Sequence, residues 1–498
     1  MIKSNGGIIG PDNVTTGGAF GSASGVFKLG EVTNLIKDSK WPTAGPQGFQ
    51  VANSCRFNRG SSDKLARTPG SASNKRTWTW SGWIKRGVLG VQSNDIFNAY
   101  NASGFWERFY FNSSDILEYD NDVAGTDWTL QSQQVFRDPS AWYHMCFAKD
   151  TTQGTEANRL KIYVNGVQIA LNEVANGYPS QNYEGYINDT LPTTLGSLNN
   201  DSYYDGYMSE VTFIDGQQLA PTSFGEFNSQ TGIWVPKVVT GLTFGTNGFY
   251  LPFTNSGALG EDFSGEDNDF TVTNLTSLDQ STDTCSTNFA TWNPLFRRGT
   301  ITPTFTNGSL TSDFTGGAQQ FALTTFGASS GKWYAEMKWV SSHGNAACVT
   351  GILDMDFSGT ADPNGAVTNA FSYFASGNKN VSGSSSSYGA SYGAGDIIGI
   401  AIDCDNSKLY FSKNGVYQNS GVPTSGSTGT GAIPIISGVT YGIYGSEYDG
   451  RVADLNTGNA PYVVSTGNAD TNGFGNFEYA VPTGFLSLNT KNLTTVLA

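Results

Sequence analysis

Short runs with apolar residues at every second position recur along most of the chain. The clearest are residues 77–84 (TWTWSGWI) and 331–339 (GKWYAEMKW), and residues 142–148 (WYHMCFA), 207–214 and 395–403 are more continuous apolar runs of strand length. Alternation with a period of two is typical of β-strands, which present successive side chains to opposite faces of a sheet. No amphipathic pattern long enough for a four-turn helix accompanies them. The pattern therefore predicts an all-β protein.

Two Asn-Gly pairs lie between such runs. Asn165-Gly166 separates residues 160–164 from 167–169, and Asn414-Gly415 separates residues 408–412 from 416–417. Both positions of a tight two-residue turn need positive φ, which Asn and Gly adopt most readily. Each pair therefore predicts a β-hairpin.

The composition agrees with strands and turns. Aromatic residues make up 13% of the chain, charged residues only 14%, and glycine occurs 62 times. Sheets favour aromatic and β-branched residues, and their turns favour glycine and asparagine. The 498 residues are too many for one ordinary domain and predict two to four.

The patterning divides the chain into four parts. We expect an N-terminal arm over residues 1–48, a β-sandwich over 49–235, a β-rich connector over 236–299 and a second β-sandwich over 300–498. The arm carries too few apolar residues to fold alone. The Ser/Gly-rich residues 382–393 predict a flexible insertion in the second sandwich.

Charge and cysteine content exclude several classes of protein. The formal net charge is −15, whereas proteins that bind nucleic acid or anionic membranes present basic surfaces. The five cysteines are far apart and form no CxxC pair, which argues against a zinc ribbon and indicates free thiols, as in a reducing cytoplasm. We expect no secretory signal and no membrane insertion, because no long apolar run is present.

The first block resembles the concanavalin A-like, laminin-G-type jelly roll. The resemblance rests on WTWSGWIKR (78–86), WYHMCFAKD (142–150), LKIYVNGVQ (160–168) and YYDGYMSEVTFIDGQQLAP (203–221). It implies a two-sheet sandwich that binds sugars, lipids or proteins. The second block resembles a SPRY domain, through GKWYAEMKW (331–339), GDIIGIAIDCDNSKLYFSKNGV (395–416) and FEYAVPTGFLSLN (477–489). That resemblance implies a protein-interaction module without catalytic residues.

The whole arrangement resembles structural proteins of marine phages. SNGGIIGP (4–11), SGVFKLGEV (24–32) and DTCSTNFATWNPL (283–295) carry this resemblance. It implies a virion protein, assembled in the host cytoplasm and released by lysis, that is a homo-oligomer, with a trimer favoured. Its partners would be other virion proteins and a host-surface glycan or protein. The candidate anchoring residues are the apolar residues of the arm: Ile8, Ile9, Phe27, Leu29, Leu35 and Ile36.

Three functions are consistent with the sequence. The first is a tail or head fibre that recognises the host, and the second is a capsid decoration or joint protein without a receptor role. The third, a glycan depolymerase, has less support, because the E-x-D-x-x-E string of related glucanases is absent and Glu107, Asp115 and Glu118 are scattered. With only two histidines, His144 and His343, and no GxSxG, HExxH or Walker motif, we predict no catalytic site.

Calcium is the candidate cofactor, and aromatic residues are the candidate ligand site. Asp201 and Asp205, near Asn199 and Asn200, supply oxygen ligands of the kind that Ca²⁺ prefers, although turn chemistry explains such residues equally well. Residues 261–269 are a second acidic candidate. Because Trp and Tyr present an apolar face with a polar edge, we expect a ligand surface at Trp106, Tyr119 and Trp128.

Overall fold

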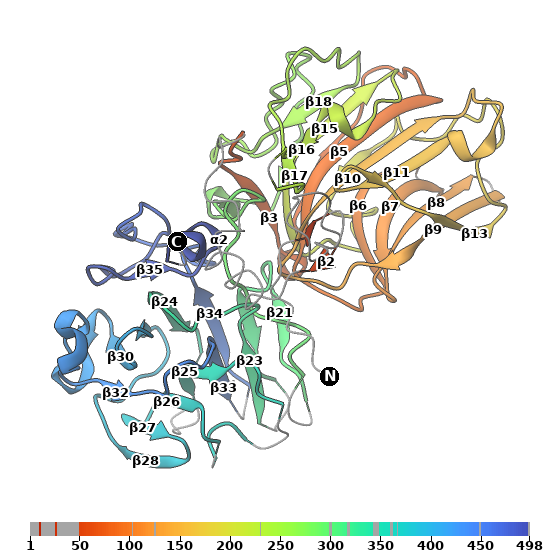
Figure 1. Ribbon diagram of the computed structural model, residues 1–498. Helices are drawn as coiled ribbons and strands as arrows, with labels where there is room; N and C mark the ends of the chain where they lie inside the picture. The colour runs from red at the N-terminus through yellow and green to blue at the C-terminus, as the bar shows by residue number, and fades with distance from the viewer. Residues whose placement is uncertain are drawn as a thin grey trace, which may run out of the picture. The chain divides into compact units, whose positions relative to one another are not determined.

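The chain folds into two β-sandwich units (Figure 1). In this computed structural model the described residues are 9–10, 25–26, 49–101, 103–123, 126–229, 231–297, 301–315, 319–341, 348–358, 362–365, 367–447 and 450–496. Of the predicted anchoring residues only Ile9 is among them, where β1 (Ile9–Gly10) pairs with β2 (Gly25–Val26). The other five, and the rest of the predicted arm, lie outside the described residues. The prediction of an all-β protein is confirmed.

The first unit spans residues 49–286 and contains two eight-stranded antiparallel sheets. One sheet has the order β12 (Val167–Gln168), β11 (Leu160–Val164), β10 (Trp142–Asp150), β5 (Thr77–Arg86), β15 (Gly206–Asp215), β3 (Ser54–Phe57) and β20 (Gln280–Ser281), with β18 (Phe249–Leu251) also paired to β15. The other has the order β13 (Leu171–Ala175), β9 (Thr126–Val135), β8 (Ile116–Val123), β7 (Trp106–Asn112), β6 (Ser93–Tyr100), β14 (Thr193–Leu195), β4 (Lys64–Arg67) and β19 (Thr271–Thr273).

Alternation along β5 explains why it lies at the centre of its sheet. Trp78, Trp80 and Ile84 point into the space between the two sheets and are fully buried. Trp83 points to the opposite face, where it packs with Trp142, Tyr207 and Trp234. Trp234 belongs to a small hairpin of β16 (Gly225–Phe227) and β17 (Trp234–Pro236). Both faces of β5 are therefore covered, which accounts for its nearly continuous apolar character.

The predicted connector is divided between the two units. β18, β19 and β20 lie within residues 236–286 and pair with β15, β4 and β3 of the first sandwich. Asp283 of the same segment forms a buried ion pair with Lys85 at 2.7 Å. Residues from 287 onward belong to the second unit. Instead of a separate connector, the segment completes the first sandwich, because its short strands satisfy edges that β3 and β4 would otherwise leave open.

The second unit contains a nine-stranded and a six-stranded sheet. The larger has the order β21 (Thr304–Thr306), β22 (Thr311–Asp313), β34 (Val452–Asn456), β24 (Lys332–Trp339), β29 (Ile397–Asp403), β30 (Lys408–Lys413) and β31 (Val416–Tyr417), with β32 (Ile433–Pro434) on β30 and β35 (Leu486–Ser487) on β24. The smaller has the order β23 (Gln320–Leu323), β33 (Tyr441–Glu447), β25 (Val349–Asp354), β26 (Ala370–Phe374), β27 (Asn378–Val381) and β28 (Ser384–Ser387). A short helix, α2 (Thr490–Val496), follows β35.

The predicted flexible insertion at residues 382–393 is instead part of the second sandwich. β28 pairs with β27 at the edge of the smaller sheet. Tyr388 and Tyr392 are buried in the core, and the Tyr392 hydroxyl donates to the carbonyl of Tyr373 at 2.7 Å. The two tyrosines anchor a segment whose serines and glycines alone indicate a loop.

Both predicted hairpins are present. Asn165 and Asn414 each have φ of 48°, and the glycines that follow them have φ of 80° and 79°. The turns join β11 to β12 and β30 to β31. Among the described residues, no helix has the length and apolar character needed to cross a membrane.

Candidate functional site

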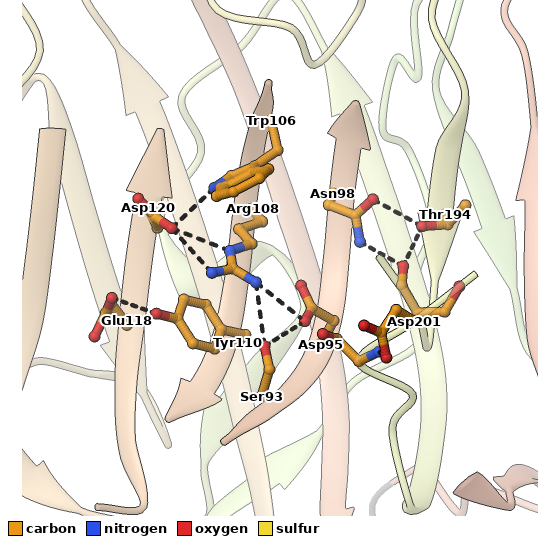
Figure 2. A network of polar contacts seen from close by, with 12 residues as sticks. Ser93, Asp95, Asn98, Trp106, Arg108, Tyr110, Glu118, Asp120, Thr194 and Asp201 are labelled. Atoms are coloured by element: carbon orange, nitrogen blue, oxygen red, sulfur yellow. Dashed lines mark hydrogen bonds and ion pairs between the residues drawn. The ribbon is translucent and has the colours of Figure 1, made fainter. Parts of the chain in front are cut away.

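The outward face of β7 places three side chains in a row. Trp106, Arg108 and Tyr110 alternate with Phe109 and Phe111, which point into the core. The guanidinium carbon of Arg108 lies 4.9 Å from the Trp106 ring centre and 3.8 Å from the Tyr110 ring centre. Figure 2 shows the guanidinium between the two rings. Cation–π contacts on both sides hold Arg108 in one orientation.

Asp120 of β8 fixes this row from the neighbouring strand. It lies opposite Arg108 in the strand register. Its Oδ2 accepts hydrogen bonds from Arg108 Nε at 3.1 Å, Arg108 Nη2 at 3.0 Å and Trp106 Nε1 at 2.8 Å. One carboxylate therefore orients both the guanidinium and the indole (Figure 2). Two residues further along β7, the Tyr110 hydroxyl donates to Glu118.

Asp95 of β6 holds the other side of Arg108. Arg108 Nη1 lies 3.1 Å from Ser93 Oγ and 3.4 Å from Asp95 Oδ2. The register between β6 and β7 shifts between Asp95 and Phe97, and this irregularity places the Asp95 carboxyl beneath the row. Burial raises the pKa of Asp95 to about 7, although Arg108 acts against that rise. Its Oδ1 has no hydrogen-bond partner in the described part of the chain.

A tight hairpin forms the opposite wall. Leu198 and Asp201 pair across a turn, and Asn199, Asn200 and Ser202 have positive φ values of 45°, 59° and 53°. Strained backbone of this kind persists where the surrounding structure fixes it, and it is common at binding sites. The hairpin and the β7 row enclose a pocket of about 480 Å³. Other lining residues are Arg59, Gln92, Tyr100 and Asn101.

Of the three predicted ligand-binding aromatics, only Trp106 lines this pocket. Tyr119 pairs with Phe109 across the sheet and is fully buried in the core. Trp128 stands opposite Asn121 and packs against Tyr183, with ring centres 4.4 Å apart. Because side chains alternate along a strand, Tyr119 and Trp128 share the inward face with Phe109. The prediction of one surface that includes all three is therefore wrong.

The two predicted calcium ligands, Asp201 and Asp205, also differ in exposure to solvent. Asp201 is exposed and lines the pocket. Asp205 is buried, and its Oδ2 accepts a hydrogen bond from the backbone amide of Arg59 at 3.2 Å. No group of three or more His, Cys, Asp or Glu side chains suited to a metal ion occurs among the residues that the structure describes. In the second acidic candidate, Asp262 accepts hydrogen bonds from the backbone amides of Tyr250, Ser264 and Asn268 and so organises a turn.

The scattered carboxylates of the first sandwich each have a local partner. Glu107 pairs with Lys149 in the interior, Asp115 lies 3.1 Å from Arg86, and Glu118 accepts from Tyr110. His144 is buried, with Nε2 2.9 Å from Ser81 Oγ, and lies between the rings of Trp83 and Trp234. Burial lowers its pKa to about 3. His343 lies outside the described residues.

The sequence interpretation missed Arg59, Arg108 and Asp120. The signal for Arg108 is present, because Trp106, Arg108 and Tyr110 occupy alternate positions of one predicted strand and must share a face. Arg59 and Asp120 come from other parts of the chain, so only the strand register brings them to the row.

Two parts of the chain match known family models. Residues 59–220 match the concanavalin A-like lectin/glucanases superfamily, and residues 332–442 match the SPRY domain. The chain thus contains a concanavalin A-like domain, which carries the pocket, followed by a SPRY domain. The search of curated proteins gave no match.

Solved structures also resemble parts of the chain. The SPRY domain of human HERC1 is 16% identical, with 29% of this chain and 87% of that chain covered and a TM-score of 0.25. A human SPRY domain is 18% identical, with 29% and 90% covered and a TM-score of 0.23. A heptameric SAP-like pentraxin from Limulus polyphemus is 17% identical, with 34% and 78% covered and a TM-score of 0.25.

Proposed function

We propose that this protein is a non-enzymatic carbohydrate-binding protein and that the pocket beside Trp106 holds the sugar. The observation that carries the proposal is the composition of the pocket. A tryptophan and two tyrosines provide apolar surface, and amide, hydroxyl and guanidinium groups surround them. Ligand sites combine apolar walls with a few fixed polar groups in this way, and aromatic rings pack well on the C–H faces of sugars. The match to the concanavalin A-like lectin/glucanases superfamily supports carbohydrate binding.

Preorganisation of the site supports a binding role. Asp120, Arg108 and the two rings hold one another in place through their own contacts. Groups that are already fixed lose little conformational entropy when a sugar binds. One oxygen of Asp120, Oδ2, accepts all three hydrogen bonds from Arg108 and Trp106, which favours a structural function for this carboxylate over acid–base catalysis.

Binding of the full-length protein to immobilised glycans tests this function. Trp106→Ala should lower the affinity for a bound glycan by about tenfold or more, because a truncated aromatic side chain at the centre of a site typically has an effect of that size. Phe263→Ala is the matched control, since Phe263 is 47% exposed and does not line the pocket. Equal loss in both variants, or no loss in either, would argue against the pocket.

The setting in which the sugar is bound is a further part of the proposal. The resemblance to marine phage proteins supports a virion component that docks by its N-terminal arm and displays both sandwiches, as an oligomer, toward host-surface glycans. Repeated weak sites raise avidity without new contacts. The alternative is a capsid decoration or joint protein, and it predicts particles that contain this protein but whose host attachment is unchanged by Trp106→Ala. A glycan depolymerase would instead release reducing ends from a bound glycan, and we expect no release.

A further inference from the structure

Among the residues that the structure describes, Arg59 is the cation that lines the pocket without a carboxylate partner. It begins a short 3-10 turn (Arg59–Ser61) after β3, and its backbone amide is held by Asp205 at 3.2 Å. In its side chain, Nη1 donates to the carbonyl oxygen of Ser93 at 3.0 Å. Within the described part of the chain, no carboxylate oxygen lies within ion-pair distance of its guanidinium. The other pocket cation, Arg108, pairs with Asp120 and Asp95.

The Arg59 guanidinium is half-buried and lines the pocket, so an anionic group of a ligand could pair with it there. The planar fork of arginine fits a carboxylate through two parallel hydrogen bonds, which are about twice as strong as hydrogen bonds between neutral groups. We infer that the pocket selects a saccharide that carries a carboxylate, with Arg59 as the partner of that carboxylate. The inference rests on the proposed carbohydrate-binding function and names the class of sugar.

Asp201 limits how much negative charge the pocket accepts. Its exposed carboxylate also lines the pocket. A densely charged polymer, such as a highly sulfated glycan, would place several anions near this carboxylate, and like charges at short range repel. The pocket therefore favours a sugar chain with isolated carboxylates, such as a uronic acid among neutral units.

Matched pairs of oligosaccharides test this inference. The full-length protein is titrated with a panel of uronic-acid oligosaccharides and with the same oligosaccharides after reduction of each carboxyl to a neutral alcohol. We expect the acidic member of the recognised pair to bind about tenfold or more tightly, as a charge-assisted hydrogen bond implies. The preference should weaken as salt is added.

Three variants assign the effect to Arg59. Arg59→Gln should remove the preference, so that the acidic sugar and its neutral counterpart bind the variant with equal affinity. Arg76→Gln is the control, because Arg76 is an exposed arginine paired with Glu184 at 2.8 Å away from the pocket lining. Asp201→Asn should raise the affinity for the acidic sugar by a few-fold, and this result is informative even if Arg59→Gln does not fold.

The possible failures are distinguishable. Equal binding of acidic and neutral members, unaffected by Arg59→Gln and Asp201→Asn, would overturn the carboxylate inference and leave carbohydrate binding intact. Preference for the densely sulfated glycan would also overturn it. Binding of no saccharide in the panel would overturn the proposed function itself.

Discussion

Asp95 is the residue whose charge state links the site to stability. Its pKa is raised by burial from the ordinary value of 3.8 to about 7. Between these two pH values the folded protein binds a proton at Asp95 that the unfolded chain does not. The contribution of Asp95 to the free energy of unfolding is therefore fully present below about pH 4 and is lost as the pH rises through 7.

Asp95→Asn removes this titration because an amide stays neutral. We expect the free energy of unfolding of the unsubstituted protein to fall, relative to that of the variant, by up to about 4 kcal/mol between pH 4 and pH 8. Urea unfolding of both proteins at several pH values measures the difference. Parallel pH profiles for the two proteins would contradict the buried position of the Asp95 carboxyl.

The prediction of Tyr119 as a site residue is wrong because it did not consider which face of the strand the side chain occupies. Residues 116–122 alternate, with Leu117 and Tyr119 on one face and Glu118 and Asp120 on the other. That alternation already assigns Tyr119 to the core and Asp120 to the outward face. Selecting residues by aromatic type alone placed Tyr119 at the surface. Arg59 could not be found in this way, since its approach to the pocket depends on tertiary structure.

Elements with a strong local signal are those that the sequence predicts well. The Asn-Gly turns and the alternating strands β5, β10, β24 and β29 lie where the patterning places them. Short strands such as β18 and β20 have no such signal. They form because other strands offer an open edge. For example, β20 pairs with β3, which lies more than 200 residues earlier in the chain. Pairing at such distance is set by tertiary structure.

The turn between β30 and β31 allows a matched test of this element. Gly415 has φ of 79°, and a Cβ there would lie 2.6 Å from Cδ1 of Tyr479. Gly395 has φ of 85°, and a Cβ there would meet nothing within 4 Å. Gly395→Ala should lower the free energy of unfolding by about 1 kcal/mol through backbone strain alone. Gly415→Ala should lower it by about 1–3 kcal/mol more, because the added methyl group also crowds the Tyr479 ring.

Thermal unfolding of the two alanine variants gives the comparison. The expected order is the unsubstituted protein, then Gly395→Ala, then Gly415→Ala. If the two variants were equally stable, crowding against Tyr479 would contribute nothing and the packing described for this turn would be incorrect.

On the scale of the whole molecule, the division of the chain is the clearest difference from the sequence interpretation. The acidic, turn-rich composition of residues 260–269 suggests a connector, yet this part of the chain belongs to the first unit. The composition of a segment indicates whether it can fold alone, but it does not show which sheet edges the segment pairs with. Lys85 shows the consequence, since its ion pair with Asp283 is inaccessible to solvent on both sides.

Two fragments test this division. Residues 49–286 should unfold in one cooperative transition, whereas residues 49–235 should be less stable by more than about 3 kcal/mol or fail to fold. The shorter fragment loses β18, β19 and β20 and leaves the Lys85 ammonium buried without its partner, and removing one member of a buried pair typically costs about 3–5 kcal/mol. Circular dichroism during urea titration measures both. Equal stability of the fragments would restore the predicted boundary at residue 235.

The most direct test of the central claim is a crystal structure of the full-length protein with the glycan that it binds most tightly. Electron density for a sugar between the β7 row and the Leu198–Ser202 hairpin, with its ring beside Trp106, is the predicted result. A sugar bound in the SPRY domain, or elsewhere on the concanavalin A-like domain with the Trp106 pocket empty, would contradict the account.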